Sequence, residues 1–472
     1  MRYSNHGCVR QQMSFLRRQF LQDGGLPFGD VLSRKIVTQA LTAINVRWLN
    51  RIYSPLVTLW VCLSQVLYPD QSCRAAVARL NAHRLSRRQR PCSARTGAYC
   101  QAKRRLPEEF FARVARKTGS ALDSKVDSKW LWKGRRVYIY DGSTVLMPDT
   151  VENQLVYPQV YNQKAGVGFP IARIAAVFSL ACGAVLDLGI CRYAGKGQSE
   201  TGLLRKLWSL FRPGDVVLGD RLLCSWMEIA TLQARGIDCV CRLNNNRKAD
   251  FRRGKRLSSN DHMVFWPKPA RRRAWDQKIY DSLPGFLMIR ECRVRIDQPG
   301  FRTKSLVIVT TLLDNTTFTK SDLVQLYRAR WNAELDLRSL KATLQMDMLR
   351  SKRPEQVRKE IWTHILAYNL IRTIMAQAAV RYDLEPRSIS FKGTIQTLEA
   401  FRPFLAVAER DARLRQHLCR ELLKAIADHR VATQPNRFEP RQKKRRKLRY
   451  NFLMVPRWEA KGAILRGTFI EN

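Results

Sequence analysis

The stretch ARIAAVFSLACGAVLDLGICRY (172–193) contains two apolar runs separated by a Cys-Gly pair. Two such runs with a turn signal between them predict a β-hairpin. The apolar runs RVYIYD (136–141), DVVLGD (215–220) and IDCVCRL (237–243) predict three more strands, and the last two alternate with helical patterns. Three strands in a meander followed by strand–helix alternation predict an α/β fold, in which helices flank a mixed sheet.

The segments around this sheet domain are mainly helical in pattern. Helical patterns cover residues 30–52, 55–67, 320–348, 354–382 and 396–429, and a strand pattern covers 305–313. We predict a helical N-terminal domain over residues 1–125, the sheet domain over 126–382, and a C-terminal helical region with a basic tail over 383–472. Residues 244–303 break the alternation, which predicts a β-rich insertion that interrupts the sheet.

The chain carries a strong excess of positive charge. Its 472 residues include 84 Lys and Arg against 39 Asp and Glu, a formal net charge of +45. The segments 84–105 and 437–450 each contain a dense run of Lys and Arg. This composition predicts a polyanionic partner, which would be DNA, RNA or an anionic membrane, and disfavours a role in small-molecule metabolism.

The sequence favours a nucleic acid over a membrane. The apolar run 55–67 is too short to span a bilayer, and the basic runs lack an amphipathic helix with an aromatic face. The first residues do not resemble a secretory signal, and the 12 dispersed cysteines lack zinc-finger spacing, so we expect reduced, mostly buried thiols in a cytoplasmic protein. The run KKRRK (443–447) could also be interpreted as a nuclear localisation signal.

Two acidic residues follow predicted strands directly. Asp141 ends the run VYIY, and Asp220 ends VVLG. An acid at the carboxyl end of a strand is a frequent site position in open α/β sheets. Either Asp alone could instead be a helix N-cap or a turn residue, but two at equivalent strand ends favour a functional site.

The helical pattern LVQLYRARWNAELDLRSLKATLQ (323–345) has two neighbouring stripes. The apolar stripe, predicted to face the core, consists of Leu326, Ala329, Ala333, Leu337, Leu340 and Leu344. Beside it, the spacing of Tyr327, Arg330, Glu334 and Lys341 places all four along one line at the rim of the core. Arg330 and Glu334 could alternatively form a solvated i,i+4 ion pair on the surface.

The pattern Tyr-x2-Arg-x3-Glu-x6-Lys resembles the YREK signature of the bacterial insertion sequence 4 transposases. The resemblance spans nearly the whole chain, because further segments match that family's blocks in order. These segments are SCRAAVARL (72–80), TGAYCQAKRRLP (96–107), YIYDGSTVLMPDT (138–150), QKAGVGFP (163–170), GDRLLCSW (219–226), RWNAELDLRSLK (330–341), AYNLIR (367–372) and RFEPRQKKRRK (437–447).

This resemblance implies an RNase H-like catalytic domain with a DDE triad at Asp141, Asp220 and Glu334. Cleavage of a phosphodiester needs an activated attacking oxygen and a stabilised leaving oxygen, which two divalent cations held by carboxylates can provide. Carboxylate oxygens suit Mg²⁺ or Mn²⁺, and the absence of a His cluster from the sequence disfavours zinc.

The remaining residues of the polar line have a matching role. Tyr327, Arg330 and Lys341 would contact DNA phosphates beside the cleaved bond. Arg221, which follows Asp220, is a weaker candidate, and we expect it to be exposed.

The family also implies the partners. The protein would be a DNA transposase that binds the terminal inverted repeats and target double-stranded DNA, cuts and joins by a cut-and-paste route, and works as a homodimer in a synaptic complex at the bacterial nucleoid. Some members form a DNA hairpin with a flipped base, for which Trp266 or Trp275 would be candidates, although a structural Trp is the better interpretation. The alternatives are a catalytically inactive DNA-binding repressor and a structure-specific RNase H-like nuclease.

Overall fold

The computed structural model describes residues 6–21, 26–45, 51–164, 166–195, 198–273, 275–296, 305–408, 411–431, 455 and 457–468. The basic tail 437–450 lies outside these residues, so its predicted role is not addressed by the structure. In the described part of the chain, no helix is long and apolar enough to cross a membrane.

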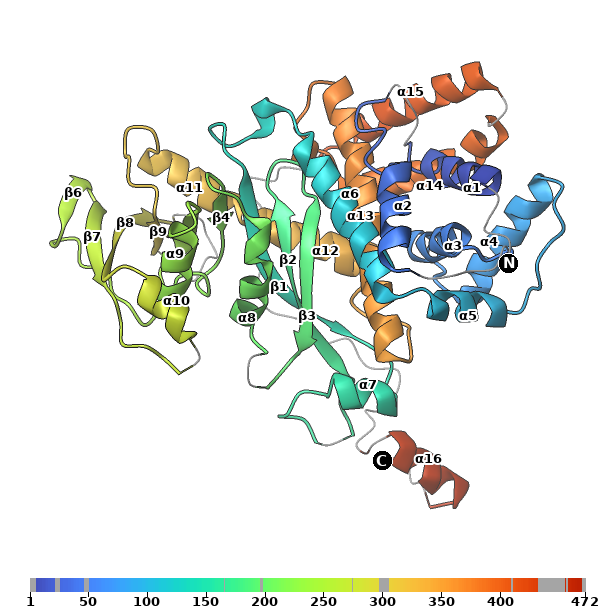
Figure 1. Ribbon diagram of the computed structural model, residues 1–472, viewed down its shortest axis with the longest axis horizontal. Coiled ribbons are helices and arrows are strands. Elements are labelled where there is room, and N and C mark those ends of the chain that lie inside the picture. Colours follow the sequence, from blue (N-terminus) through green and yellow to red (C-terminus); the bar gives the residue numbers. More distant parts are fainter. Residues whose placement is uncertain are drawn as a thin grey trace.

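One mixed sheet runs through the middle of the protein and out to one end (Figure 1). Among the described residues it has nine strands in the order β3-β2-β1-β4-β5-β9-β8-β7-β6. The strands are β1 (Val137–Leu146), β2 (Ile171–Ser179), β3 (Val185–Arg192), β4 (Val216–Leu218), β5 (Asp238–Arg242), β6 (Lys255–Ser258), β7 (Asp261–Pro267), β8 (Phe286–Arg295) and β9 (Ser305–Thr310). The α/β class and the mixed sheet predicted from the sequence are confirmed.

The β2–β3 hairpin is confirmed as well. The two strands pair antiparallel, and Gly183 in the turn has a φ of +78°. A Cβ atom at this glycine would lie 2.8 Å from Nε of Arg372, so the turn needs glycine both for its backbone conformation and for space.

Strand β1 is longer than the sequence predicts. Asp141 does not end it, because β1 continues to Leu146 and Asp141 pairs with Ala176 of β2. On its other side, β1 pairs with β4 only from Val137 to Ile139. The polar residues that follow Tyr140 are therefore compatible with a strand, since they lie where one neighbouring strand has ended.

The segment 244–303 is β-rich as predicted, but it does not interrupt the sheet. Strands β7 and β8 pair with each other, and β8 pairs with β9, so this segment extends the same sheet at its far end. The buried ion pair between Arg290 and Asp261, at 2.7 Å, joins β8 to β7. The extension joins the rest of the sheet through the pairing of β9 with β5, two strands distant in sequence, and local patterns do not reveal such pairing.

Alternate residues of the strands face two different cores. Val137 and Ile139 belong to the larger core, which includes residues of the helices α11 (Lys320–Ala329), α12 (Trp331–Arg338) and α13 (Pro354–Arg381). Tyr138 and Tyr140 belong to the second core, with residues of α8 (Glu200–Leu207) and α9 (Trp226–Gln233). Odd-numbered positions of β1 therefore face α12.

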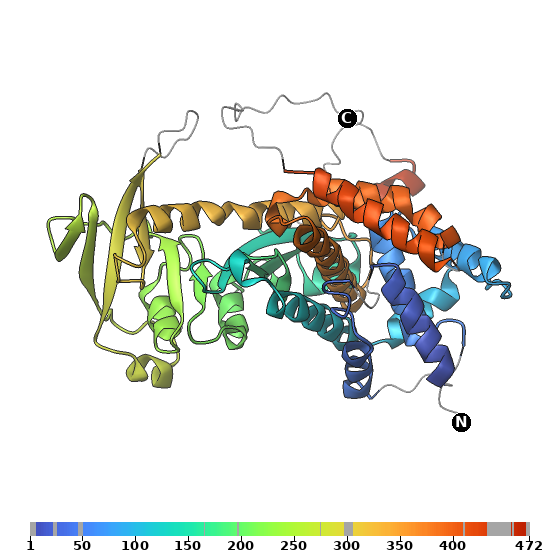
Figure 2. The same cartoon turned by 90° about the horizontal axis from the view of Figure 1, so that it is seen from above.

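The predicted helix 320–348 is divided. Helices α11 and α12 follow one another along nearly one axis across the sheet (Figure 2), with Arg330 between them in a helical conformation. A π-helical turn, η3 (Ser339–Thr343), ends the element before Met348, and Gln345 has a φ of +58°. The predicted core stripe is buried except Ala329, which is half-buried.

The remaining helices gather at the other end of the protein (Figure 1). They are α1 (His6–Arg18), α2 (Arg34–Ala43), α3 (Pro55–Leu67), α4 (Cys73–Ser86), α5 (Gly97–Arg105), α6 (Glu108–Ser124), α14 (Phe391–Val407) and α15 (Ala412–Asp428), with the short helices α7 (Val151–Val156), α10 (Gln277–Ser282) and α16 (Arg457–Leu465) elsewhere. Helix α13 packs against α3, α6 and α15, so the N-terminal helices share the larger core. The helical region predicted over 396–429 consists of two helices, α14 and α15.

Candidate active site

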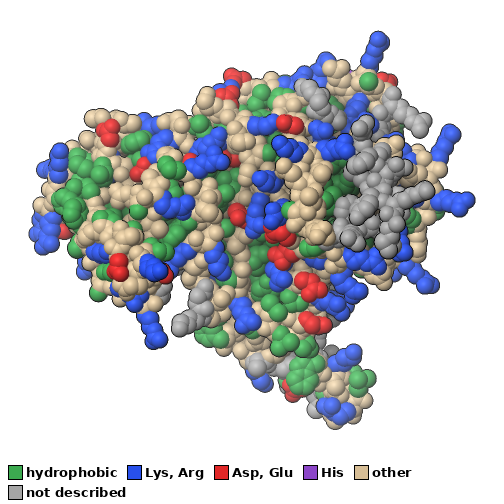
Figure 3. Space-filling view, viewed as in Figure 1, with side chains coloured by type: hydrophobic (Ala, Val, Ile, Leu, Met, Phe, Trp, Pro, Cys, Tyr) green, Lys and Arg blue, Asp and Glu red, His purple; other side chains and the backbone are tan. Residues whose placement is uncertain are grey.

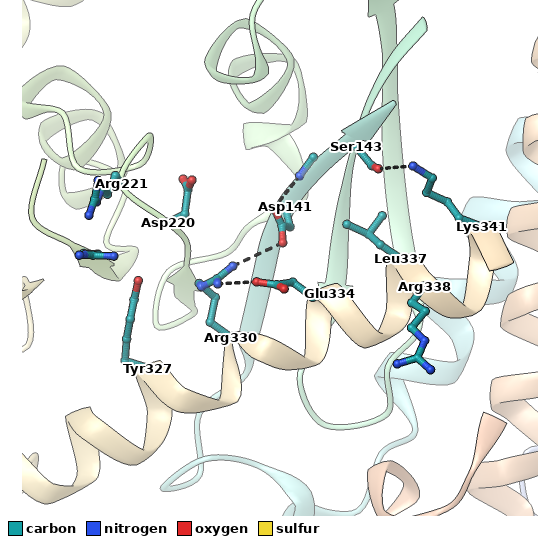
Figure 4. Close-up of a pocket in the computed structure, with 12 residues that line it drawn as sticks. Asp141, Ser143, Asp220, Arg221, Tyr327, Arg330, Glu334, Leu337, Arg338 and Lys341 are labelled. Atoms are coloured by element: carbon teal, nitrogen blue, oxygen red, sulfur yellow. Dashed lines mark hydrogen bonds and ion pairs between the residues drawn. The ribbon is translucent and has the colours of Figure 1, made fainter. Parts of the chain in front are cut away.

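A cavity of about 560 Å³ opens between the middle of β1, the chain that follows β4, and the helices α11 and α12. All six residues predicted from the sequence as site residues line it (Figure 4). The lining residues are Asp141, Gly142, Ser143, Asp220, Arg221, Arg242, Tyr327, Arg330, Glu334, Leu337, Arg338 and Lys341.

The sheet brings Asp141 and Asp220 to equivalent positions. Ile139 of β1 pairs with Leu218 of β4 in parallel register, and each Asp follows two residues later. The Gly142 amide donates a hydrogen bond of 2.9 Å to Asp141 Oδ1, and the Leu222 amide donates one of 2.8 Å to Asp220 Oδ1. Each carboxylate thus keeps part of its capacity to accept further ligands.

Helix α12 contributes the third carboxylate together with a guanidinium group. Arg330 Nη2 donates to Glu334 Oε1 at 2.8 Å, and Arg330 Nη1 lies 3.4 Å from Asp141 Oδ2 (Figure 4). The side chain of Arg330 is only 19% exposed. The i,i+4 pair considered from the sequence exists, but it lies in the cavity and not on an open surface.

Asp141 is the most perturbed of the three acids. Burial raises the pKa of its carboxyl to about 6, and the neighbouring Asp220 and Glu334 add to the rise, while the Gly142 amide and Arg330 oppose it. A buried carboxylate beside two others is stabilised by a nearby cation.

Two further residues of the polar line point their polar atoms into the site. Lys341 Nζ donates a hydrogen bond of 3.1 Å to Ser143 Oγ on β1. Burial raises the pKa of the Tyr327 phenol, so it stays protonated at neutral pH and can donate a hydrogen bond.

The structure adds two cationic residues to the cavity, one a weaker candidate from the sequence and one that sequence reasoning missed. Arg221 was expected to be exposed, and that was wrong: it lines the cavity, half-buried, and its Nε is buried without a hydrogen-bond partner among the described residues. Arg242 ends β5, beside β4, and also lines the cavity. Arg242 lies inside the predicted strand 237–243 and is not acidic, so the strand-end argument did not single it out.

A buried charge network supports α12 from behind. Asp336 is 0% exposed, accepts hydrogen bonds from Arg387 Nη1 at 3.0 and 3.3 Å, and pairs with Arg372. Arg387 Nη2 in turn donates to the Ser179 carbonyl oxygen at 2.6 Å. The network ties the helix that carries Glu334 to α13 and to the β2–β3 turn.

The candidate aromatic residues for base stacking are structural in this protein. Trp266 is 2% exposed, and its indole donates to Glu291 Oε1 at 2.9 Å. Trp275 is 9% exposed. Among the described residues the cysteines are free thiols and most are buried, as expected.

The acids of the cavity fit a hard divalent cation by their chemistry, since their donors are carboxylate oxygens. Within the described ranges, however, no group of three His, Cys, Asp or Glu residues is gathered closely enough to hold a metal ion. The guanidinium of Arg330 contacts two of the three acids, Asp141 and Glu334.

The transposase DDE domain family matches residues 132–370, just over half of the chain and all of the cavity-lining segments. The chain belongs to the DDE transposase family. The predicted resemblance to the insertion sequence 4 transposases is confirmed, and this DDE transposase is a DNA-cleaving and DNA-joining enzyme. Members of the family generally use divalent metal ions.

Two transposases of insertion sequence elements agree with this assignment, and one solved structure is reported as similar. Transposase InsG of insertion sequence element IS4 from Escherichia coli (strain K12) is 25% identical over 355 residues, which are 74% of this chain and 76% of that protein. The putative transposase InsL of insertion sequence element IS186A, from the same strain, is 34% identical over 82 residues, 17% of this chain and 21% of that protein. The piggyBac transposase, solved in a synaptic complex with hairpin DNA, is similar at 10% identity and a TM-score of 0.43, over 90% of this chain and 88% of that chain.

Proposed function

We propose that Asp141, Asp220 and Glu334 are the carboxylates that hold two Mg²⁺ or Mn²⁺ ions for DNA cleavage and strand transfer. The observation that carries this proposal is that three acids from two strands and one helix line a single cavity. The strand order β3-β2-β1-β4-β5 supports the RNase H-like core that the resemblance predicts. Bound divalent ions would activate the attacking oxygen and stabilise the leaving oxygen.

The protein's own side chains would hold and orient the DNA. Arg330 offers a planar fork of donors to a phosphate, Lys341 offers a point charge, and Tyr327 offers a phenolic hydroxyl. All three line the same cavity as the acids, so phosphates bound by them would lie beside the carboxylates.

We further propose which DNA is bound. Several of the relatives are named as transposases of insertion sequence elements, and this supports terminal inverted repeats and a target duplex as the double-stranded partners. Lys and Arg side chains are spread over the face shown in Figure 3, where Asp and Glu are fewer, which suits contact with duplex backbone. The helical segment 1–125 would bind DNA, and two copies would assemble on paired ends, in the cytoplasm at the nucleoid.

Cleavage of a duplex that carries the element's own terminal inverted repeats tests this function. With Mg²⁺ or Mn²⁺ we expect cuts at the repeat boundary followed by joining of the 3′ ends to a second duplex, and no cuts in EDTA. Asp220→Asn should bind the duplex and not cut it. Tight binding without cutting in any metal would favour the inactive DNA-binding repressor, and cutting without joining would favour the nuclease.

A further inference from the structure

Arg330 occupies the position between two of the acids that a cation would otherwise share. Its Nη2 lies 2.8 Å from Glu334 Oε1 and its Nη1 lies 3.4 Å from Asp141 Oδ2. The two contacts are made by the two terminal nitrogens of the guanidinium, and the side chain is largely shielded from solvent. The guanidinium therefore serves as the counter-ion of Asp141 and Glu334.

The whole cavity is positive despite its acids. Among the described residues that line it, five are cationic and three are anionic, and the cations are Arg221, Arg242, Arg330, Arg338 and Lys341. Burial lowers the pKa of Arg242, and the nearby charges of Arg221 and Arg330 lower it further, as expected for crowded cations. A divalent cation that enters this cavity alone meets net repulsion.

We propose that Arg330 blocks metal binding until DNA phosphate draws its guanidinium away from Asp141 and Glu334, so that DNA and metal bind cooperatively. This inference rests on the proposed function, in which the same acids hold the metal. A phosphate is a better partner for the planar fork than two separate carboxylates, because it accepts two parallel hydrogen bonds. It also neutralises part of the excess positive charge in the cavity.

The other cations of the cavity are not the counter-ions of Asp141 and Glu334. Lys341 donates to the hydroxyl of Ser143. Within the described chain, the ion pairs to Asp141 and Glu334 come from Arg330. Arg338 lines the cavity on the same helix, two turns from Arg330, and is exposed. Arg338→Gln therefore removes the same charge from the cavity without removing an ion pair to the acids.

Coupling of this kind is reciprocal. If DNA raises the affinity for metal by some factor, metal raises the affinity for DNA by the same factor. The cooperativity has a functional consequence, because the metal-loaded site would form on bound DNA and rarely in the free protein.

A titration of the full chain with Mn²⁺ tests the inference without any cleavage. The electron paramagnetic resonance signal of free Mn²⁺ decreases as the ion binds, and this decrease measures the affinity. Without DNA, we expect Arg330→Gln to bind Mn²⁺ at least about tenfold more tightly than wild type, and Arg338→Gln to differ from wild type by less than about threefold. A duplex that ends at the cleavage position, and so cannot be cut there, should raise the affinity of wild type by about tenfold or more and that of Arg330→Gln much less. The variant that carries both Arg330→Gln and Glu334→Gln lacks one acid of the proposed metal site. The Mn²⁺ that it still binds measures binding elsewhere.

The outcomes separate the inference from the proposed function. If wild type without DNA binds Mn²⁺ as tightly as Arg330→Gln, or if Arg338→Gln gains as much as Arg330→Gln, Arg330 has no special blocking role and the inference is wrong. If neither wild type nor Arg330→Gln shows Glu334-dependent Mn²⁺ binding even with DNA, the assignment of the metal site itself is wrong.

Discussion

Ile139 of β1 lies opposite Leu218 of β4 where the two strands run parallel. This register helps to bring Asp141 and Asp220 to one cavity, because each follows its paired residue by two positions. Glu334 reaches the same cavity from α12, which crosses the face of the sheet to which Ile139 points. The arrangement has consequences for DNA binding, stability and pH dependence.

Lys341→Ala should weaken DNA binding and reduce its salt dependence. If Lys341 contacts a phosphate, the slope of the logarithm of the association constant against the logarithm of salt concentration should fall by about 1. Binding of duplex DNA at several salt concentrations measures this slope. Lys392→Ala, which removes an exposed Lys of α14, is the control, and an unchanged slope for Lys341→Ala would exclude the phosphate contact.

Asp336→Asn should destabilise the protein. Removing the buried charge leaves the guanidinium groups of Arg372 and Arg387 without their anion, which costs about 3 kcal/mol in the free energy of unfolding. Denaturant titration of wild type and variant measures the loss. Asp428→Asn, at the exposed end of α15, is the control and should change stability by less than about 0.5 kcal/mol.

Gly119→Ala should disturb the contact of α6 with β3. A Cβ atom at Gly119 would lie 2.2 Å from the carbonyl oxygen of Val185, a backbone atom that cannot easily move. We expect a loss of about 2 kcal/mol or more in the free energy of unfolding. In contrast, Gly97→Ala on α5 meets no atom within 4 Å and should raise stability by about 0.5 to 1 kcal/mol. Equal stability of the two variants would show that α6 does not approach β3 this closely.

Stability should fall in mild acid because of His364. Burial lowers the pKa of this imidazole to about 4, whereas in the unfolded chain it is about 6.5. The unfolded chain therefore takes up a proton below pH 6.5 that the folded protein takes up only near pH 4, so His364 lowers the free energy of unfolding by about 2 kcal/mol between pH 7 and pH 5. The raised pKa of Asp141 acts in the opposite direction over this range, so the contribution of His364 is measured as the difference between wild type and His364→Gln. Thermal unfolding across this range measures the drop. His364→Gln should remove it and the exposed His417→Gln should not, and a persisting drop in His364→Gln would assign it to other groups.

The residues that the sequence singles out line one cavity, and their signals in the sequence are local. Tyr327, Arg330, Glu334 and Lys341 share one line of a helix, and a helical repeat fixes that line without knowledge of the rest of the fold. The hairpin with its turn at Gly183 is equally local.

What the sequence did not predict depends on distant partners. The true end of β1 is set by β2, which continues to pair after β4 has ended, and the place of β7 and β8 in the sheet is set by β9. An acid such as Asp336 looks like a solvated surface residue until the positions of Arg372 and Arg387 are known. The same holds for Arg221, because it lines the cavity together with residues that are distant in sequence, such as Arg242 and Tyr327.

Cleavage of the terminal inverted repeat duplex by Glu334→Gln, compared with wild type, tests the assignment of the three acids most directly. Glu355→Gln, an identical change at an exposed position of α13, is the matched control. With Mg²⁺ present, we expect wild type and Glu355→Gln to cut and Glu334→Gln to bind the duplex equally well but to cut at least about a hundredfold more slowly. Cutting by Glu334→Gln at the wild-type rate would contradict the account.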